Sequence, residues 1–153
     1  MNLGKKAFAN DFSEFQKEGV KVRIIGQKEK LSKSFQKAIN EIEEATKDNK
    51  GMTLNLALSY GGRTEIVEAI KSILKKKIPP EKITEDIISQ NLWTSDLDFI
   101  IRTGKEQRIS NFLIWQAAYS ELYFSPKYWP DFSERDLEEA LEEFSRRQRR
   151  FGK

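Results

Sequence analysis

Polar side chains meet an apolar, aromatic run in residues 102–124, RTGKEQRISNFLIWQAAYSELYF. The polar part holds two arginines, Arg102 and Arg108, and the hydroxyl of Ser110, whereas the apolar part ends near Glu121. Guanidinium groups match phosphate oxygens in geometry and charge, and a carboxylate can ligate Mg²⁺. The spacing therefore predicts a site that holds an anion, such as a diphosphate, beside an apolar group.

Each of these residues also has a purely structural interpretation. Either arginine could pair with a carboxylate such as Glu106, and Glu121 could be a salt-bridge partner at the rim of a sheet. For the cluster as a whole, the residues alone support the anion site and structural pairing about equally. The turn at residues 60–63, YGGR, is a weaker candidate anion site, because such turns are more often tight connections.

The composition excludes several kinds of chemistry. The 153 residues include no cysteine and no histidine, which removes disulfides, thiol nucleophiles, Ser-His-Asp catalysis and the usual zinc sites. Any metal must be oxygen-ligated, and Mg²⁺ is the obvious candidate. We expect a cytoplasmic protein, since we find neither a run long and apolar enough to span a membrane nor a signal-peptide core.

Short strands alternate with helices along the sequence. Strands are predicted at residues 20–26, 52–60, 96–103 and 120–125. Helices are predicted over 3–19, around 31–42 and 66–74, from the proline pair at 79–80 onward, over 110–118, and from Ser133. The alternation predicts an α/β fold with a mainly parallel sheet flanked by helices, in a single domain over residues 1–153. The chain starts in mid-helix with no preceding strand, so the fold is expected to be incomplete at its N-terminus.

These elements would position the candidate residues at one edge of the sheet. Ligands of open parallel sheets bind outside the carboxyl ends of the strands, where the YGGR turn and Arg102 fall. Residues 110–118, SNFLIWQAA, are apolar on most sides and are expected to form a buried helix. The N–H groups at the start of that helix would add to an anion site.

The last residues, 146–153 (RRQRRFGK), carry five positive charges, although the net charge of the sequence is only +3. The preceding helix begins acidic and ends basic, as the helix macrodipole favours. An unrelated basic α/β domain that binds nucleic acid through this tail is an alternative, but the aromatic spacing does not support it.

The string in residues 102–124, followed by WPDF and ending in RRFG, closely resembles the C-terminal half of cis-prenyltransferases, the undecaprenyl diphosphate synthases. VKVRIIG and LNLALSYGGR fit as well, so the resemblance runs through essentially the whole sequence. It implies condensation of isopentenyl diphosphate with an allylic diphosphate, usually farnesyl diphosphate. The product would be a polyprenyl diphosphate lipid carrier of cell-wall precursors. The resemblance also implies Mg²⁺, an apolar tunnel for the growing chain, a homodimer and product release at the membrane surface, without nucleic acid.

The resemblance assigns roles residue by residue. The positions that look like substrate-binding residues are Arg102, Arg108, Ser110, Arg150 and Gly152. The first three look like the isopentenyl diphosphate clamp, and the last two look like an RXG motif that reaches across a dimer interface. Glu121 looks like the Mg²⁺ ligand contributed by this half. These residue types suit the implied reaction, because cations stabilise a leaving diphosphate and an apolar tunnel keeps water from the allylic carbocation.

The sequence also departs from the family. The Asp-Gly-Asn-x-Arg-Trp loop, which supplies the catalytic aspartate and the allylic diphosphate site, is absent, and Lys105 stands where glycine is common. We therefore expect the C-terminal portion of a cis-prenyltransferase that turns over little substrate alone. The alternative is a non-catalytic partner subunit of a heteromeric enzyme. Such a partner has little need for the clamp residues and Glu121, and all of them are present.

Overall fold

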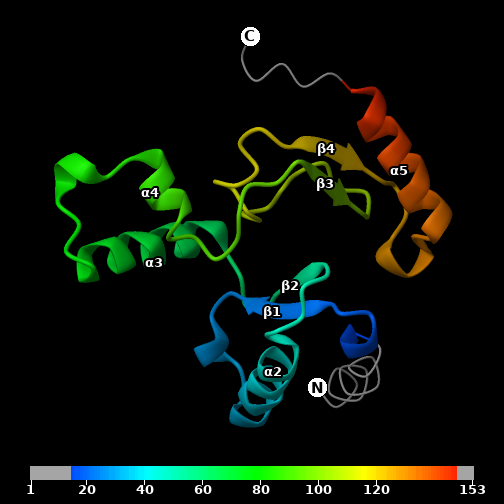
Figure 1. The fold of residues 1–153 in the computed structure, drawn as a ribbon. Coiled ribbons are helices and arrows are strands. Elements are labelled where there is room, and N and C mark those ends of the chain that lie inside the picture. Colours follow the sequence, from blue (N-terminus) through cyan, green and yellow to red (C-terminus); the bar gives the residue numbers. More distant parts are fainter. Residues whose placement is uncertain (1–14, 148–153) are drawn as a thin grey trace. The chain divides into compact units, whose positions relative to one another are not determined.

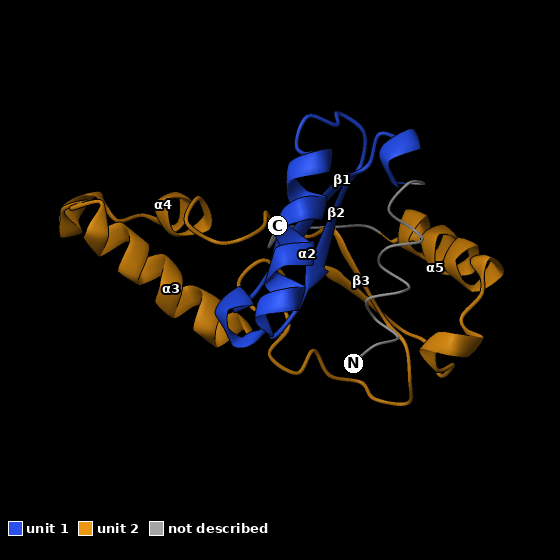
Figure 2. Ribbon diagram, turned by 90° about the horizontal axis from the view of Figure 1, so that it is seen from below, with its two compact units in different colours: residues 1–60 blue, residues 61–153 orange. Residues whose placement is uncertain are grey.

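The computed structural model describes residues 15–147, and the chain divides into two compact units, residues 1–60 and 61–153 (Figures 1 and 2). The strands are β1 (Lys21–Ile25), β2 (Thr53–Ala57), β3 (Phe99–Arg102) and β4 (Glu121–Phe124). The α-helices are α2 (Lys33–Thr46), α3 (Gly62–Lys75), α4 (Glu85–Ser89) and α5 (Glu134–Arg146). Three 3₁₀ helices complete the described part: η1 (Lys28–Lys30), η2 (Pro80–Lys82) and η3 (Trp129–Asp131).

The first unit is a strand–helix–strand arrangement. β1 and β2 pair in parallel, and α2 packs its apolar side against β1 (Figure 2). Parallel strands need a crossover connection of this kind, and the β-branched residues of β1 suit a buried strand. The buried core cluster consists of Val20, Val22, Ile24, Ile39 and Ile42. The hydroxyl of Thr46 accepts the Val22 N–H at 3.1 Å and so ties the end of α2 to β1.

The second unit is built around the parallel pair of β3 and β4. Phe99 lies opposite Glu121, and Arg102 lies opposite Phe124. α5 follows β4 and packs through Phe144, whose ring stacks on that of Phe99 with 4.7 Å between centroids. In the same unit α3 and α4 pack against each other. The carboxyl ends of both strands therefore share one edge, which is where ligands bind in folds of this class.

The four predicted strands are confirmed, and both described pairs are parallel, as the α/β prediction requires. Within residues 15–147 they form two two-stranded sheets, one in each unit. The helix predicted over 3–19 lies mostly outside the described residues, but Gly19 has φ 65°, as expected for a helix stop. The expectation of a single domain stays a prediction. No helix in the described part of the chain has the length and apolarity needed to cross a bilayer.

The helix predicted over residues 110–118 is wrong, because this segment consists of turns. Ser110, Asn111 and Leu113 have φ values of 46°, 64° and 45°, in the left-handed region that an α-helix cannot contain. Its apolar content is only partly buried: Leu113 is 5% exposed, whereas Tyr119 is 71% exposed. The segment therefore offers no helix N-terminus to an anion.

The N-terminus of α5 carries a pH-sensitive cap. Asp136 accepts hydrogen bonds from the N–H of Ser133 at 2.8 Å and from the ammonium of Lys127 at 2.7 Å. The Lys127 hydrogen bond, followed by those from Ser133, holds the pKa of the Asp136 carboxyl well below its usual range. A carboxyl with a depressed pKa in the folded state stabilises the fold at pH values above its unfolded pKa, and this stabilisation fades as the pH falls toward the folded pKa.

We expect Asp136→Asn to lower the free energy of unfolding at pH 7, since the capping carboxylate is lost. The difference from the parent chain should narrow progressively below about pH 4, near the unfolded pKa of an aspartate. Urea unfolding at pH 7 and pH 3 measures both values. Glu138→Gln, on the exposed side of the same helix, is the matched control and should change little. An equal difference at both pH values would contradict this account of the cap.

Candidate diphosphate-binding site

Arg102 is the last residue of β3, and its guanidinium organises the loop that follows. The Nη1 group donates to the main-chain oxygen of Arg108 and, at 3.2 Å, to the hydroxyl oxygen of Ser110. The structure therefore brings the side chain of Arg102 to the hydroxyl of Ser110 and to the main chain of Arg108, at the carboxyl end of a parallel strand. Within residues 15–147 only Nη1 of Arg102 forms hydrogen bonds, so its other N–H donors remain available for an anion.

Arg108 shows the structural pairing that the sequence left open. Its Nη1 group forms an ion pair with Glu106, and the two side chains are 63% and 52% exposed. Ion pairs at such exposed positions are worth roughly 0–1 kcal/mol, because water and salt screen them. Arg108 can therefore exchange Glu106 for a phosphate oxygen at small cost, and the ion pair does not remove it from the candidate site.

The YGGR turn lies against this loop through Asn111. The N–H of Gly62 donates to the main-chain oxygen of Asn111 at 2.8 Å, and the N–H of Arg63 donates to its Oδ1 at 2.9 Å. Gly62 is required here, since a Cβ at this position would lie 2.8 Å from a carbon of Ile114. The first amides of α3 thus bind Asn111, and the structure does not leave them facing an anion.

Asn111 is a residue whose role the sequence reasoning missed. Its side chain caps α3, while its neighbour Ser110 contacts Arg102, so it joins the two candidate stretches. The available signal was its residue type, because asparagine tolerates a positive φ and its side-chain oxygen can accept a backbone N–H. The sequence showed Asn111 only as one polar residue in a polar run. Because a helix was expected over this segment, a contact between Asn111 and α3 was not predicted.

Replacement of Asn111 by alanine should lower the free energy of unfolding by about 1–2 kcal/mol. The Arg63 N–H loses its acceptor, and alanine at φ 64° adds backbone strain. Urea unfolding measures the loss. Asn111→Asp is the matched variant, because it keeps an acceptor oxygen and places a negative charge at a helix N-terminus, so it should stay near the parent value. Equal losses for both variants would show that the cap is not what the asparagine provides.

Glu121 lies away from the arginine cluster. It is the first residue of β4 and sits opposite Phe99, three residues before Arg102 in the strand register. At roughly 3.3 Å per residue this separates it by about 10 Å along the strands from the carboxyl end where Arg102 lies. The structure therefore joins Arg102 to Ser110 and to the main chain of Arg108, but it does not bring Glu121 to them.

The carboxylate of Glu121 is held by Arg147, just after α5. The Nη1 group of Arg147 donates to Glu121 Oε2 at 3.0 Å and to the main-chain oxygen of Leu122 at 2.9 Å. Its other terminal nitrogen binds Glu143. The hydrogen bond to Glu143, and to a smaller extent the one to Glu121, raises the pKa of the Arg147 guanidinium.

The described residues contain no group of three or more acidic, cysteine or histidine side chains that could hold a metal. Arg150 and Gly152 lie outside the described residues.

Comparison with known proteins decides the family. The Prenyltransf family model, described as "Putative undecaprenyl diphosphate synthase", matches residues 1–152. The chain belongs to this prenyltransferase family. The family and the fold that the motifs of residues 102–124 predicted are therefore confirmed.

Similar relatives are isoprenyl transferases from bacteria. The protein from Streptococcus pneumoniae R6 is 46% identical over 163 residues, covering 99% of this chain and 65% of the relative. The Thermotoga maritima protein is 46% identical over 157 residues, covering 99% of this chain and 67% of the relative. This prenyltransferase chain thus spans about two thirds of the length of the relatives that it matches.

Two crystal structures resemble the fold. A probable undecaprenyl diphosphate synthase from Campylobacter jejuni has a TM-score of 0.92 and 36% identity, covering 99% of this chain and 72% of that one. Lavandulyl diphosphate synthase from Lavandula x intermedia, in complex with dimethylallyl diphosphate, has a TM-score of 0.89 and 38% identity. That match covers 95% of this chain and 66% of the lavender enzyme.

Proposed function

We propose that this chain supplies the isopentenyl diphosphate site of a cis-prenyltransferase. The complete reaction condenses isopentenyl diphosphate with an allylic diphosphate, such as farnesyl diphosphate, to make a polyprenyl diphosphate such as undecaprenyl diphosphate. The observation that carries the proposal is the contact between Arg102 and Ser110 at the carboxyl end of β3 in a member of this family. The dimethylallyl diphosphate bound to the lavender relative is itself an allylic diphosphate, which supports this substrate class.

The clamp residues would hold and orient the substrate. The remaining N–H donors of Arg102 and the guanidinium of Arg108, released from Glu106, would bind the diphosphate oxygens, and Ser110 would add a hydroxyl donor. Fixing the diphosphate end sets the position of the alkene that attacks the allylic carbon. Orientation of this kind converts a bimolecular reaction into an effectively unimolecular one. Arg150 and Gly152 are proposed to reach the diphosphate bound by the partner of a homodimer.

Turnover is proposed to require the Asp-Gly-Asn-x-Arg-Trp loop, which these 153 residues do not contain. Mg²⁺ is proposed as the cofactor on the basis of the resemblance, and it would supply positive charge to a leaving diphosphate. Glu121 is the residue that would hold the ion, and its Oε2 is paired with Arg147 in this structure. A cytoplasmic location and product release at the membrane surface complete the proposal, with a role in cell-wall precursor synthesis.

Calorimetric titration of the chain with isopentenyl diphosphate tests the site, and isopentenol is the control that lacks the diphosphate. We expect one-to-one binding of the diphosphate and none of the alcohol. A parallel assay follows labelled isopentenyl diphosphate with farnesyl diphosphate and Mg²⁺, in which the chain alone should form little polyprenyl product. Failure to bind isopentenyl diphosphate would overturn the proposed site. Efficient turnover by the chain alone would overturn the proposed requirement for the aspartate loop.

A further inference from the structure

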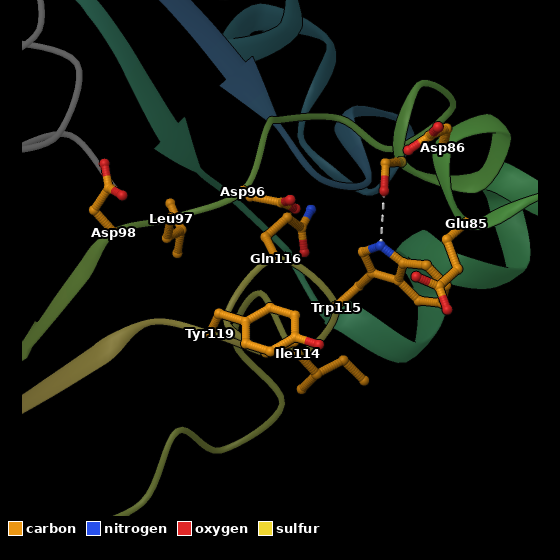
Figure 3. Close-up of a pocket in the computed structure, with 11 residues that line it drawn as sticks. Glu85, Asp86, Asp96, Leu97, Asp98, Ile114, Trp115, Gln116 and Tyr119 are labelled. Atoms are coloured by element: carbon orange, nitrogen blue, oxygen red, sulfur yellow. Dashed lines mark hydrogen bonds between the residues drawn. The ribbon is translucent and has the colours of Figure 1, made fainter. Parts of the chain in front are cut away.

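A pocket of about 560 Å³ lies in the second unit, at the amino ends of β3 and β4 (Figure 3). Its volume falls in the range typical of small-molecule sites. One wall comes from α4, and the others come from the segments that lead into the two strands. Arg102 and Ser110 follow β3 at its carboxyl end, so they contribute nothing to this pocket.

A buried amide oxygen of Gln116 has no partner at this pocket. Gln116 is 2% exposed, and its Nε2 group donates to Glu65 at 3.1 Å and to the main-chain oxygen of Thr94 at 3.5 Å. Because both partners accept hydrogen bonds, they fix the orientation of the amide. The remaining atom, Oε1, has no hydrogen-bond partner among the described residues, and in Figure 3 it lies on the side of Trp115 and Tyr119. An unpaired buried acceptor is costly, and an N–H donor from a ligand would satisfy it.

Two hydrogen bonds hold Asp96 beside Gln116. The Gln116 amide binds the main-chain oxygen of Thr94, and the N–H of Leu97 donates to the main-chain oxygen of Gln116 at 3.1 Å. Asp96 lies between these two bonded residues in the chain, and it lines the same pocket as Gln116. Within residues 15–147 its carboxylate forms no ion pair with a basic side chain. The pocket therefore presents a carboxylate next to an amide acceptor.

The indole of Trp115 is fixed at the other side of the amide. Its Nε1 group donates to the hydroxyl of Ser89, the last residue of α4, at 2.9 Å, and both residues line the pocket. An indole face attracts organic cations and stacks with planar ones. The lining contains no lysine or arginine, although the sequence as a whole is basic, so no side chain of the pocket supplies such a cation.

We propose that this pocket binds a small guanidinium compound. One N–H of the guanidinium donates to Gln116 Oε1, a second pairs with the Asp96 carboxylate, and the plane of the cation stacks on Trp115. A guanidinium suits this set because it is planar and carries N–H donors in several directions, whereas an ammonium is compact and strongly hydrated. A metal ion fits less well, since the described residues contain no group of three acidic ligands.

Nuclear magnetic resonance of the ¹⁵N-labelled full chain, titrated with butylguanidine at fixed ionic strength, tests the proposal. We expect the indole N–H of Trp115 and the side-chain amide of Gln116 to shift along one saturating curve. The dissociation constant should be on the order of 1 mM, as a few weak polar contacts allow. The indole of Trp129 is 74% exposed and lies outside the pocket, so its signal should not follow this curve.

Matched ligands and variants separate the contributions. Butylurea has a similar planar head without the charge and should bind at least tenfold more weakly, and butylamine keeps the charge without the planar fork and should bind about fivefold more weakly. Asp96→Asn should weaken the binding of butylguanidine about fivefold. Asp131→Asn makes the same change outside the pocket and should leave binding unchanged. Circular dichroism establishes that both variants are folded.

Three outcomes would overturn the proposal. Equal shifts of the Trp115 and Trp129 indoles would indicate general attraction of the cation to aromatic surface. Butylamine that binds as tightly as butylguanidine would exclude recognition of a planar fork, and equal affinities for Asp96→Asn and Asp131→Asn would exclude Asp96 as the partner. The titration with isopentenyl diphosphate is a separate measurement, so the two proposals stand or fall separately.

Discussion

Arg102→Ala is expected to weaken the binding of isopentenyl diphosphate by about 30-fold, the largest effect of any single substitution in the proposed site. A hydrogen bond to a charged group contributes about 2 kcal/mol, which corresponds to this factor in a dissociation constant. Arg102 also holds the loop through Arg108 and Ser110, so its loss removes a ligand contact and the positioning of two neighbours. Calorimetric titration of the variant with isopentenyl diphosphate measures the effect.

Two variants separate the role of the guanidinium fork from that of charge. Arg102→Lys keeps the positive charge but cannot bind two oxygens in a planar fork, so its affinity should lie between those of the parent and the alanine variant. Arg135→Ala removes an arginine that is 86% exposed on α5 and should change binding little. If Arg102→Ala bound isopentenyl diphosphate as tightly as Arg135→Ala, the proposed clamp would be wrong.

Glu65→Leu is expected to lower the free energy of unfolding by about 3 kcal/mol, the largest effect on stability among our predictions. Glu65 is 1% exposed on α3, and its Oε1 accepts the N–H of Trp93 at 2.6 Å and the amide of Gln116 at 3.1 Å. Leucine removes this acceptor from the part-buried Trp93 N–H and from the buried Gln116 amide, and removing one partner of a buried polar network costs more than the bond contributes. Urea unfolding at pH 7 measures the loss.

The same helix offers a matched control. Glu68 is 42% exposed and pairs with Lys71 one turn away, so Glu68→Leu should change the free energy of unfolding by less than about 1 kcal/mol. Glu65→Gln keeps an acceptor oxygen for the Trp93 N–H and should lose less stability than the leucine variant. If Glu65→Leu and Glu68→Leu unfolded at the same urea concentration, the buried network would contribute nothing measurable.

Much of the fold follows from local patterns in the sequence. The apolar, β-branched run before Gly26 and the run before Arg102 predicted β1 and β3, because strand formation depends on a short stretch of suitable side chains. The alternation of these strands with helical periodicity predicted parallel pairing, and the pairs of β1 with β2 and of β3 with β4 confirm it. Position at the end of a strand also placed Arg102 at the edge where ligands bind.

Local patterns failed where distant residues compete for the same backbone. The apolar content of residues 110–118 favoured a helix, but three residues there take positive φ and the segment forms turns. Asn111 uses its oxygens for the first amides of α3, 48 residues away in the case of Arg63. Periodicity reports which side of an element is apolar, and it carries no information about which distant donor a polar atom will meet.

By itself, then, the sequence determined the strands, the parallel α/β class, the absence of histidine and cysteine chemistry, and the family, whose motifs in residues 102–124 are a linear string. Only the tertiary structure decided the partners of the charged and amide groups. Glu121 binds Arg147, 26 residues later, and lies apart from Arg102, whereas buried Glu65 meets Gln116, 51 residues later. The physical reason is that a partner is selected by the packing of elements remote in sequence. A buried polar group without a hydrogen-bond partner is costly, so burial requires that such a partner be present.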